Sequence, residues 1–134
     1  MWQCPDCGRK FKNRNQDHSC FVVPVSDHLN GKSANIVSAY RKLGYFVKLL
    51  PGVTVIPVKG AILFQAGSNF LAVKPKKTRL DIEFVLPEPS DVFPVYKVVQ
   101  ATKTKWAHFV SLEHPEEVDS QLKEWLRAAR KCSL

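Results

Sequence analysis

A chain of 134 residues, 45% of them hydrophobic and 24% charged, has the size and composition of one globular domain with a small appendage. It has no apolar run near the ~20 residues that cross a bilayer, and its N-terminus lacks a basic segment followed by an apolar one. We therefore expect a cytoplasmic protein without membrane attachment. The formal net charge is +8, and residues 32–105 hold twelve lysines and arginines against four acids. This surplus predicts an anionic partner, unless it serves solubility alone.

The first twenty residues hold three of the four cysteines, in the spacing Cys4-x2-Cys7-x10-His18-x-Cys20. Clustered cysteines with a nearby histidine are typical of metal binding in a reducing compartment. The Cys-Pro-Asp-Cys-Gly run has the proline and glycine of a tight knuckle. Four sulfur and nitrogen ligands would complete a closed tetrahedral site. The spacing predicts one structural Zn²⁺ bound by these four residues, with 1–21 as a zinc-ribbon-like element.

A basic loop separates the two ligand pairs and carries Arg9, Lys10, Lys12 and Arg14. These cations either contact phosphates or balance the charge of three thiolates around the metal. The element has too few apolar residues to offset the entropy of ordering it, so metal binding would supply its folding free energy.

Residues 22–32 are predicted to be a linker, and 33–134 a second unit that opens with a helix. Apolar side chains recur on one helical face over residues 33–50, with Ser33 as N-cap and a Pro-Gly pair at the end. From residue 53 the apolar period changes to two, which predicts strands. The strands are expected at 53–58, 61–66, 69–74, 78–86, 93–101 and 106–112. Pro57 favours a sheet edge for the first strand because proline cannot donate to a ladder.

A second helix is predicted to begin near Pro115, because a proline followed by acids suits a helix N-terminus. Its apolar stripe consists of Val118, Leu122, Trp125, Leu126 and Ala129. The links between strands are too short for parallel crossovers, so the strands must be mostly antiparallel. The sequence thus predicts an α+β fold: an antiparallel meander sheet of about six strands, covered on one face by two helices and partly wet on the other.

Several of these segments match a known family. The N-terminal matches are Trp2, Cys4, Pro5, Cys7, Gly8, Phe11, His18 and Cys20, and the body matches are 28–32, 70–77, 86–87 and 118–126. On these residues the chain resembles a bacterial domain of unknown function, family 5655, which a similar W-x-C-P-x-C-G-x-x-F…H-x-C element can precede. The resemblance implies the division into a zinc-ribbon-like element and a domain, and it implies no activity.

Two acidic residues are the best candidates for catalysis. Asp81 and Glu83 alternate on one strand, so they project from the same face with Cα atoms ~6.7 Å apart. With Lys77 or His108 nearby they could hold a divalent ion for phosphodiester cleavage. The alternative is that Arg79, Asp81 and Glu83 form cross-strand ion pairs on a wet sheet face. His108 lies on an apolar face, which favours a hydrogen-bonded core histidine, and we assign no catalytic residue.

The strongest signal in the body is a basic turn formed by Lys74, Lys76, Lys77 and Arg79. Further lysines are expected at neighbouring strand ends, namely Lys59, Lys97, Lys103 and Lys105. Such a cluster could follow a phosphate backbone, with Phe70 or Trp106 available for base stacking if they are exposed. The alternative is a solvated rim of lysines around core aromatics.

The leading hypothesis is a non-enzymatic, zinc-binding module that contacts DNA or RNA through Arg9–Arg14 and the Lys74–Arg79 turn. The second is a pocket protein or enzyme for a small anionic ligand, which a buried concave cluster would favour. That cluster would consist of Lys59, Lys74, Arg79 and His108. A third, a protein-protein adaptor, would show as a large exposed apolar patch. The sequence carries no signal for the oligomeric state.

Overall fold

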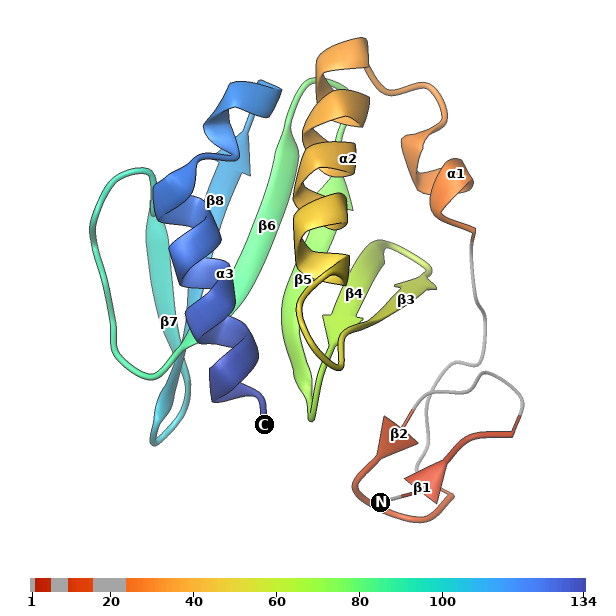
Figure 1. Cartoon of the computed structure of the whole chain (residues 1–134), viewed down its shortest axis with the longest axis vertical. Coiled ribbons are helices and arrows are strands. Elements are labelled where there is room, and N and C mark those ends of the chain that lie inside the picture. The colour runs from red at the N-terminus through yellow and green to blue at the C-terminus, as the bar shows by residue number, and fades with distance from the viewer. Residues whose placement is uncertain (1, 6–9, 16–23) are drawn as a thin grey trace.

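The computed structural model describes residues 2–5, 10–15 and 24–134 of the chain. Its elements are β1 (Trp2–Gln3), β2 (Lys10–Phe11), α1 (Val25–Leu29), α2 (Ala34–Lys48), β3 (Thr54–Val58), β4 (Ala61–Gln65), β5 (Asn69–Pro75), β6 (Leu80–Leu86), β7 (Lys97–Thr102), β8 (Lys105–Leu112), the 3-10 turn η1 (Pro115–Glu117) and α3 (Ser120–Cys132). Figure 1 shows α2 and α3 on the same side of a six-stranded sheet. The predicted α+β class and antiparallel sheet are confirmed.

The strand order in the large sheet is β3-β4-β5-β6-β8-β7, and every pairing is antiparallel. The predicted meander is correct through β6 and wrong after it, because β8 pairs with β6 and β7 takes the outer edge. The chemistry of the two strands explains the exchange. β8 alternates buried side chains over most of its length, whereas nearly all of β7 is exposed. The more apolar strand takes the interior position, and the polar one is left at the edge.

Both long helices begin at a capping side chain. The Ser33 hydroxyl accepts a hydrogen bond from the Ile36 N–H at 3.3 Å, which confirms the predicted N-cap of α2. Asp119 caps α3 by accepting from the Leu122 N–H at 2.9 Å. The predicted second helix is therefore two elements, since η1 ends at Glu117 and Asp119 starts a new helix with its own cap.

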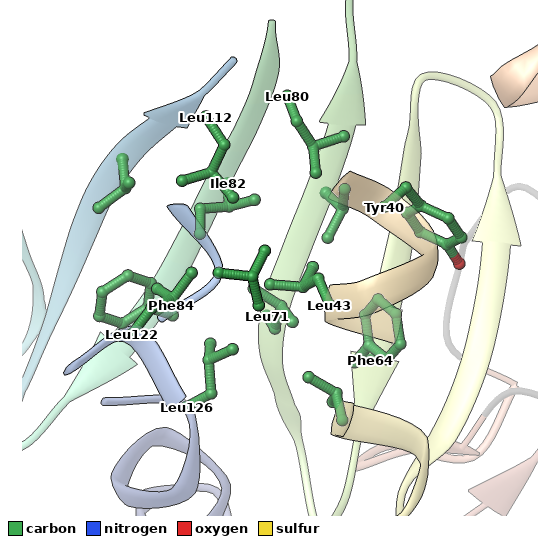
Figure 2. Close-up of a cluster of buried hydrophobic side chains, with 14 of the residues drawn as sticks. Tyr40, Leu43, Phe64, Leu71, Leu80, Ile82, Phe84, Leu112, Leu122 and Leu126 are labelled. Atoms are coloured by element: carbon green, nitrogen blue, oxygen red, sulfur yellow. The ribbon is translucent and has the colours of Figure 1, made fainter. Parts of the chain in front are cut away.

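The core lies between the helices and one face of the sheet, where Figure 2 shows buried side chains from α2 and α3 gathered with those from β4, β5, β6 and β8. The predicted inward face of β6 is confirmed, and Phe84 at its centre is fully buried. The Phe84 ring stacks on His108 at 5.6 Å and on Trp125 at 5.7 Å between ring centroids. One face of these strands is therefore a dry core.

Two segments differ from the sequence prediction. Helix α1 lies within the predicted linker, where His28 Nε2 is 2.8 Å from the Val58 carbonyl oxygen. The strand expected at 93–101 begins only at Lys97, and Phe93 lies in the preceding loop with 86% of its surface exposed. Residues 87–96 thus form a connection that carries the chain past the position of β8.

Candidate functional site

The open face of the sheet carries polar and charged side chains from four strands. The alternation that buries Phe84 turns Asp81 and Glu83 outward, as predicted. Strand pairing places Ala72, Glu83, Phe109 and Lys97 in one row across β5, β6, β8 and β7. Residues far apart in the sequence therefore share one surface, because register fixes which side chains are neighbours.

This surface is hollowed into a concavity of about 340 Å³, which we call the basic concavity. Its cationic lining residues are Lys74, Lys76, Arg79 and Lys97. Asp81 and Glu83 are its acidic lining residues, so four positive charges face two negative ones. Three of the predicted anion-binding residues are thus brought together, and Lys97 joins them across the sheet.

The carboxylate of Asp81 is held by two neighbours. Arg79 Nε lies 3.1 Å from Asp81 Oδ1, and the Ser111 hydroxyl on β8 donates to the same oxygen at 3.0 Å. The expected ion pair of Arg79 with Asp81 is present, but it is not the predicted cross-strand pair: Arg79 lies two residues before Asp81, and the cross-strand partner is a serine. Within the described ranges, no three or more His, Cys, Asp or Glu side chains form a group suited to a metal.

Two aromatic rings form the wall of the basic concavity near the sheet edge. Tyr96 is 62% exposed, and its ring centroid lies 6.4 Å from that of Phe109 at an interplanar angle of 49°. The Tyr96 N–H donates to the Phe109 carbonyl oxygen at 3.0 Å, which fixes the backbone of the loop beside β8. Sequence reasoning missed this pair, because it placed Tyr96 inside a strand at 93–101 and gave no register of that strand against β8.

The aromatic residues singled out from the sequence lie elsewhere. Phe70 is 1% exposed and belongs to the core, so its predicted stacking role is wrong. Trp106 is half-buried on β8 and pairs with Leu86, which lies five positions along β6 from Asp81. Neither side chain lines the basic concavity.

The remaining predicted cations are distributed around the sheet. Lys77 lies in the β5–β6 turn next to Lys76, where its carbonyl accepts the Ser33 N–H at 3.2 Å. Lys59 is exposed in the β3–β4 turn, and Lys103 lies in the β7–β8 turn. None of these three, nor Lys105, lines the basic concavity. The cluster proposed around strand ends is therefore smaller than predicted and centred on β5 and β6.

His108 is completely buried on the helix side of the sheet. Its Nδ1–H donates to the Trp106 carbonyl oxygen at 2.9 Å, and its Nε2 accepts the Ser90 N–H at 2.9 Å. Burial lowers the pKa of His108 below its ordinary value of 6.5, an effect that the hydrogen bond to the Trp106 carbonyl partly opposes. The prediction of a core histidine is confirmed. The cluster of His108 with Lys59, Lys74 and Arg79 is not formed.

The described part of the N-terminal segment is a short hairpin. Strands β1 and β2 pair antiparallel with Trp2 opposite Phe11, and their ring centroids lie 6.0 Å apart. Cys4 follows β1 directly and is only 3% exposed. Lys10, Lys12 and Arg14 are exposed. The predicted ligands Cys7, His18 and Cys20, like Arg9, lie outside the described residues.

An apolar groove of about 520 Å³ runs along α2 near β3. Tyr45 and Leu49 line it and are 72% and 68% exposed, with Arg41 and Lys48 beside them. This groove is the feature nearest to the apolar patch that an adaptor would need, and the adaptor hypothesis stays a prediction.

The family described as Domain of unknown function (DUF5655) matches residues 25–131. No curated protein and no solved structure matches the chain. In the described part of the chain, no helix is long and apolar enough to cross a membrane.

Proposed function

The chain belongs to the DUF5655 family, and since the family's description names no activity, we propose a function from the basic concavity itself. The proposed function is non-enzymatic binding of nucleic acid through the basic concavity and the N-terminal basic loop. The N-terminal segment is proposed to bind one structural Zn²⁺.

The observation that carries this proposal is the convergence of Lys74, Lys76, Arg79 and Lys97 on one open surface. Phosphate contacts by lysine and arginine supply most of the affinity for nucleic acid, because bound cations release condensed counterions. Asp81 opposes such contacts less than a lone carboxylate would, since Arg79 and Ser111 already hold it. Of the two acids in the concavity, Asp81 is therefore compensated by Arg79, and Glu83 is left to oppose the lysines.

The test is binding of a fluorescent oligonucleotide, followed by anisotropy over a series of salt concentrations. We expect a Kd on the order of micromolar at low salt. Because Arg79 is paired with Asp81, a plot of log K against log salt should have a slope of about −2, for contacts of the three lysines to a single strand. Binding that stays flat between low and moderate salt, or no binding at all, would refute the phosphate contacts.

The zinc proposal rests on the ligand spacing and on the hairpin that contains its first ligand. Cys4 is almost fully buried directly after β1, which pairs antiparallel with β2. A shielded sulfur beside this pair of strands fits a structural ligand. Bound Zn²⁺ would tie the two ligand pairs together and stabilise the segment, whose ligands must first lose their protons.

Metal analysis of protein purified without chelator tests this proposal. We expect about one zinc per chain, lost in a Cys4→Ser variant and kept in Cys132→Ser, a matched control in α3. Absence of metal from the wild-type protein, or equal metal content in both variants, would contradict it.

The second candidate function is binding of a small anionic ligand, which the concave shape favours. A volume of about 340 Å³ is at the lower end of the range for small-molecule sites, ~300–1,000 Å³. Competition separates the two candidates: a phosphorylated small molecule that displaces the oligonucleotide at comparable concentration would favour the pocket.

A further inference from the structure

We infer that the basic concavity takes single-stranded nucleic acid, with one unpaired base against Tyr96 and Phe109 and the adjoining phosphates along Lys74 and Lys76. This inference rests on the proposed function and specifies its substrate. The recognised chemistry is a nucleobase next to phosphate.

The aromatic wall has the properties of a stacking platform. Tyr96 exposes 62% of its surface beside the half-buried Phe109, and the two rings are tilted by 49°, so together they form a corner. Exposed tyrosine offers a flat apolar face, and every base has a matching π face, so stacking tolerates any sequence. Tyr96 and Phe109 both line the basic concavity, so the corner faces it.

Lys97 adds a cation to the same corner. Its Nζ lies 5.1 Å from the centroid of the Phe109 ring, at cation–π distance. From that position the ammonium group can also meet the phosphate of a nucleotide whose base rests on Tyr96. Apolar and cationic surface thus alternate within a few ångströms, as in proteins that bind single strands by stacking and charge together.

The position of the other cations suggests more than one nucleotide. Phe109 is on β8 and Lys74 on β5, and β6 lies between them. The two strands are therefore about 10 Å apart across the sheet. A strand that crosses this distance places one base at the aromatic corner and successive phosphates at Lys97, then at Lys74 and Lys76.

A duplex is the poorer ligand for this surface. The bases of a duplex are stacked on each other and paired, so their faces are not accessible to Tyr96 without the cost of unstacking. A duplex would bind through phosphate contacts alone. A single strand gains both phosphate contacts and base stacking, and we expect it to bind more tightly than a duplex of the same sequence and length.

The experiment compares an oligonucleotide of about 12 nucleotides with its duplex and with a mononucleotide, by anisotropy and by competition. The variants are Tyr96→Ala and Phe109→Leu. The matched control is Phe93→Ala, which removes an aromatic ring that is 86% exposed in the same loop but does not line the concavity.

We expect Tyr96→Ala to weaken binding of the single strand about tenfold while leaving the salt slope unchanged, and Phe93→Ala to bind as wild type. If Tyr96→Ala binds as wild type and the duplex binds as well as the single strand, the stacking inference is wrong while the proposed phosphate contacts stand. If the mononucleotide competes as well as the oligonucleotide, the ligand is a free nucleotide and the strand inference is wrong. If neither nucleic acid binds, the proposed function fails as well.

Discussion

The two faces of the large sheet are built from the same strands and do opposite things. On β6, Leu80, Ile82 and Phe84 point to the helices and are buried, whereas Asp81 and Glu83 alternate with them on the open face. The helix side is dry and apolar, and even its histidine has both ring nitrogens paired. The open side gathers charge and two aromatic rings. Successive side chains of a strand point to opposite faces, so neighbouring residues serve the core and the open surface in turn. A substitution on one face can therefore leave the other face unchanged.

The largest effect is expected on the covered face. Phe84→Ala removes a fully buried ring that stacks on His108 and Trp125, and we expect it to lower the free energy of unfolding by about 3–5 kcal/mol. Urea unfolding followed by circular dichroism measures this change. Glu83→Ala is the matched neighbour on the open face and should change stability by about 0.5 kcal/mol or less. Equal losses for the two variants would break the comparison.

The next effect belongs to the open face. Replacing Lys74 and Lys76 together with alanine should weaken oligonucleotide binding about tenfold and reduce the salt slope by about 1.4, because two phosphate contacts are lost. Stability should hardly change. A double variant of Lys42 and Lys131, exposed on α2 and α3, removes the same charge from the helix layer. Similar weakening by both pairs would mean that net charge alone, and no particular face, attracts the ligand.

A pH effect is expected on the covered face. Burial lowers the pKa of His108, so the folded protein holds the ring neutral at pH values where the unfolded chain already binds a proton. The unfolded state then binds more protons, and stability must fall as the pH drops below about 6.5. Protonation would also end the acceptance of the Ser90 N–H by Nε2. Urea midpoints at pH 7.5 and 5.5 should differ in wild type and differ less in His108→Gln; an equal difference in both would contradict this.

The smallest effect concerns the uncompensated acid of the open face. Glu83 lies between Ala72 and Phe109, in the middle of the row that crosses the basic concavity. Glu83→Gln removes a charge that repels phosphate while keeping the shape, and we expect affinity to rise about twofold at low salt. Anisotropy at low and high salt measures it. The gain should vanish at high salt, and weaker binding would indicate that the carboxylate itself contacts the ligand.

The sequence predicts those features that depend on neighbours along the chain. The alternation of β6, the Ser33 cap and the buried state of His108 follow from local pattern, and the structure confirms them. The order of β7 and β8 depends on which strand buries more surface against the rest of the sheet. A short stretch of sequence does not give this information. The corner of Tyr96 and Phe109 depends on the register of β7 against β8 and on the start of β7 at Lys97, which the local pattern does not give.

The candidate site was predictable in its charge and not in its shape. The basic turn at Lys74–Arg79 was visible in the sequence, but its completion by Lys97 required the register across β8. Phe70 was the wrong stacking candidate because a strict alternation would place it on the open face with Ala72 and Lys74. The register shift between Phe64 and Gln65 passes over Phe70, and Phe70 and Leu71 are both buried.

The most direct test of the open face as the binding surface is a two-dimensional NMR titration of the ¹⁵N-labelled chain with the unlabelled single strand. We predict that amide shifts change in β5, β6, β8 and the Tyr96–Lys97 segment, around the basic concavity, while the amide shifts of α2 and α3 stay unchanged. Changes concentrated on α2 and its apolar groove, with the basic concavity unaffected, would contradict it.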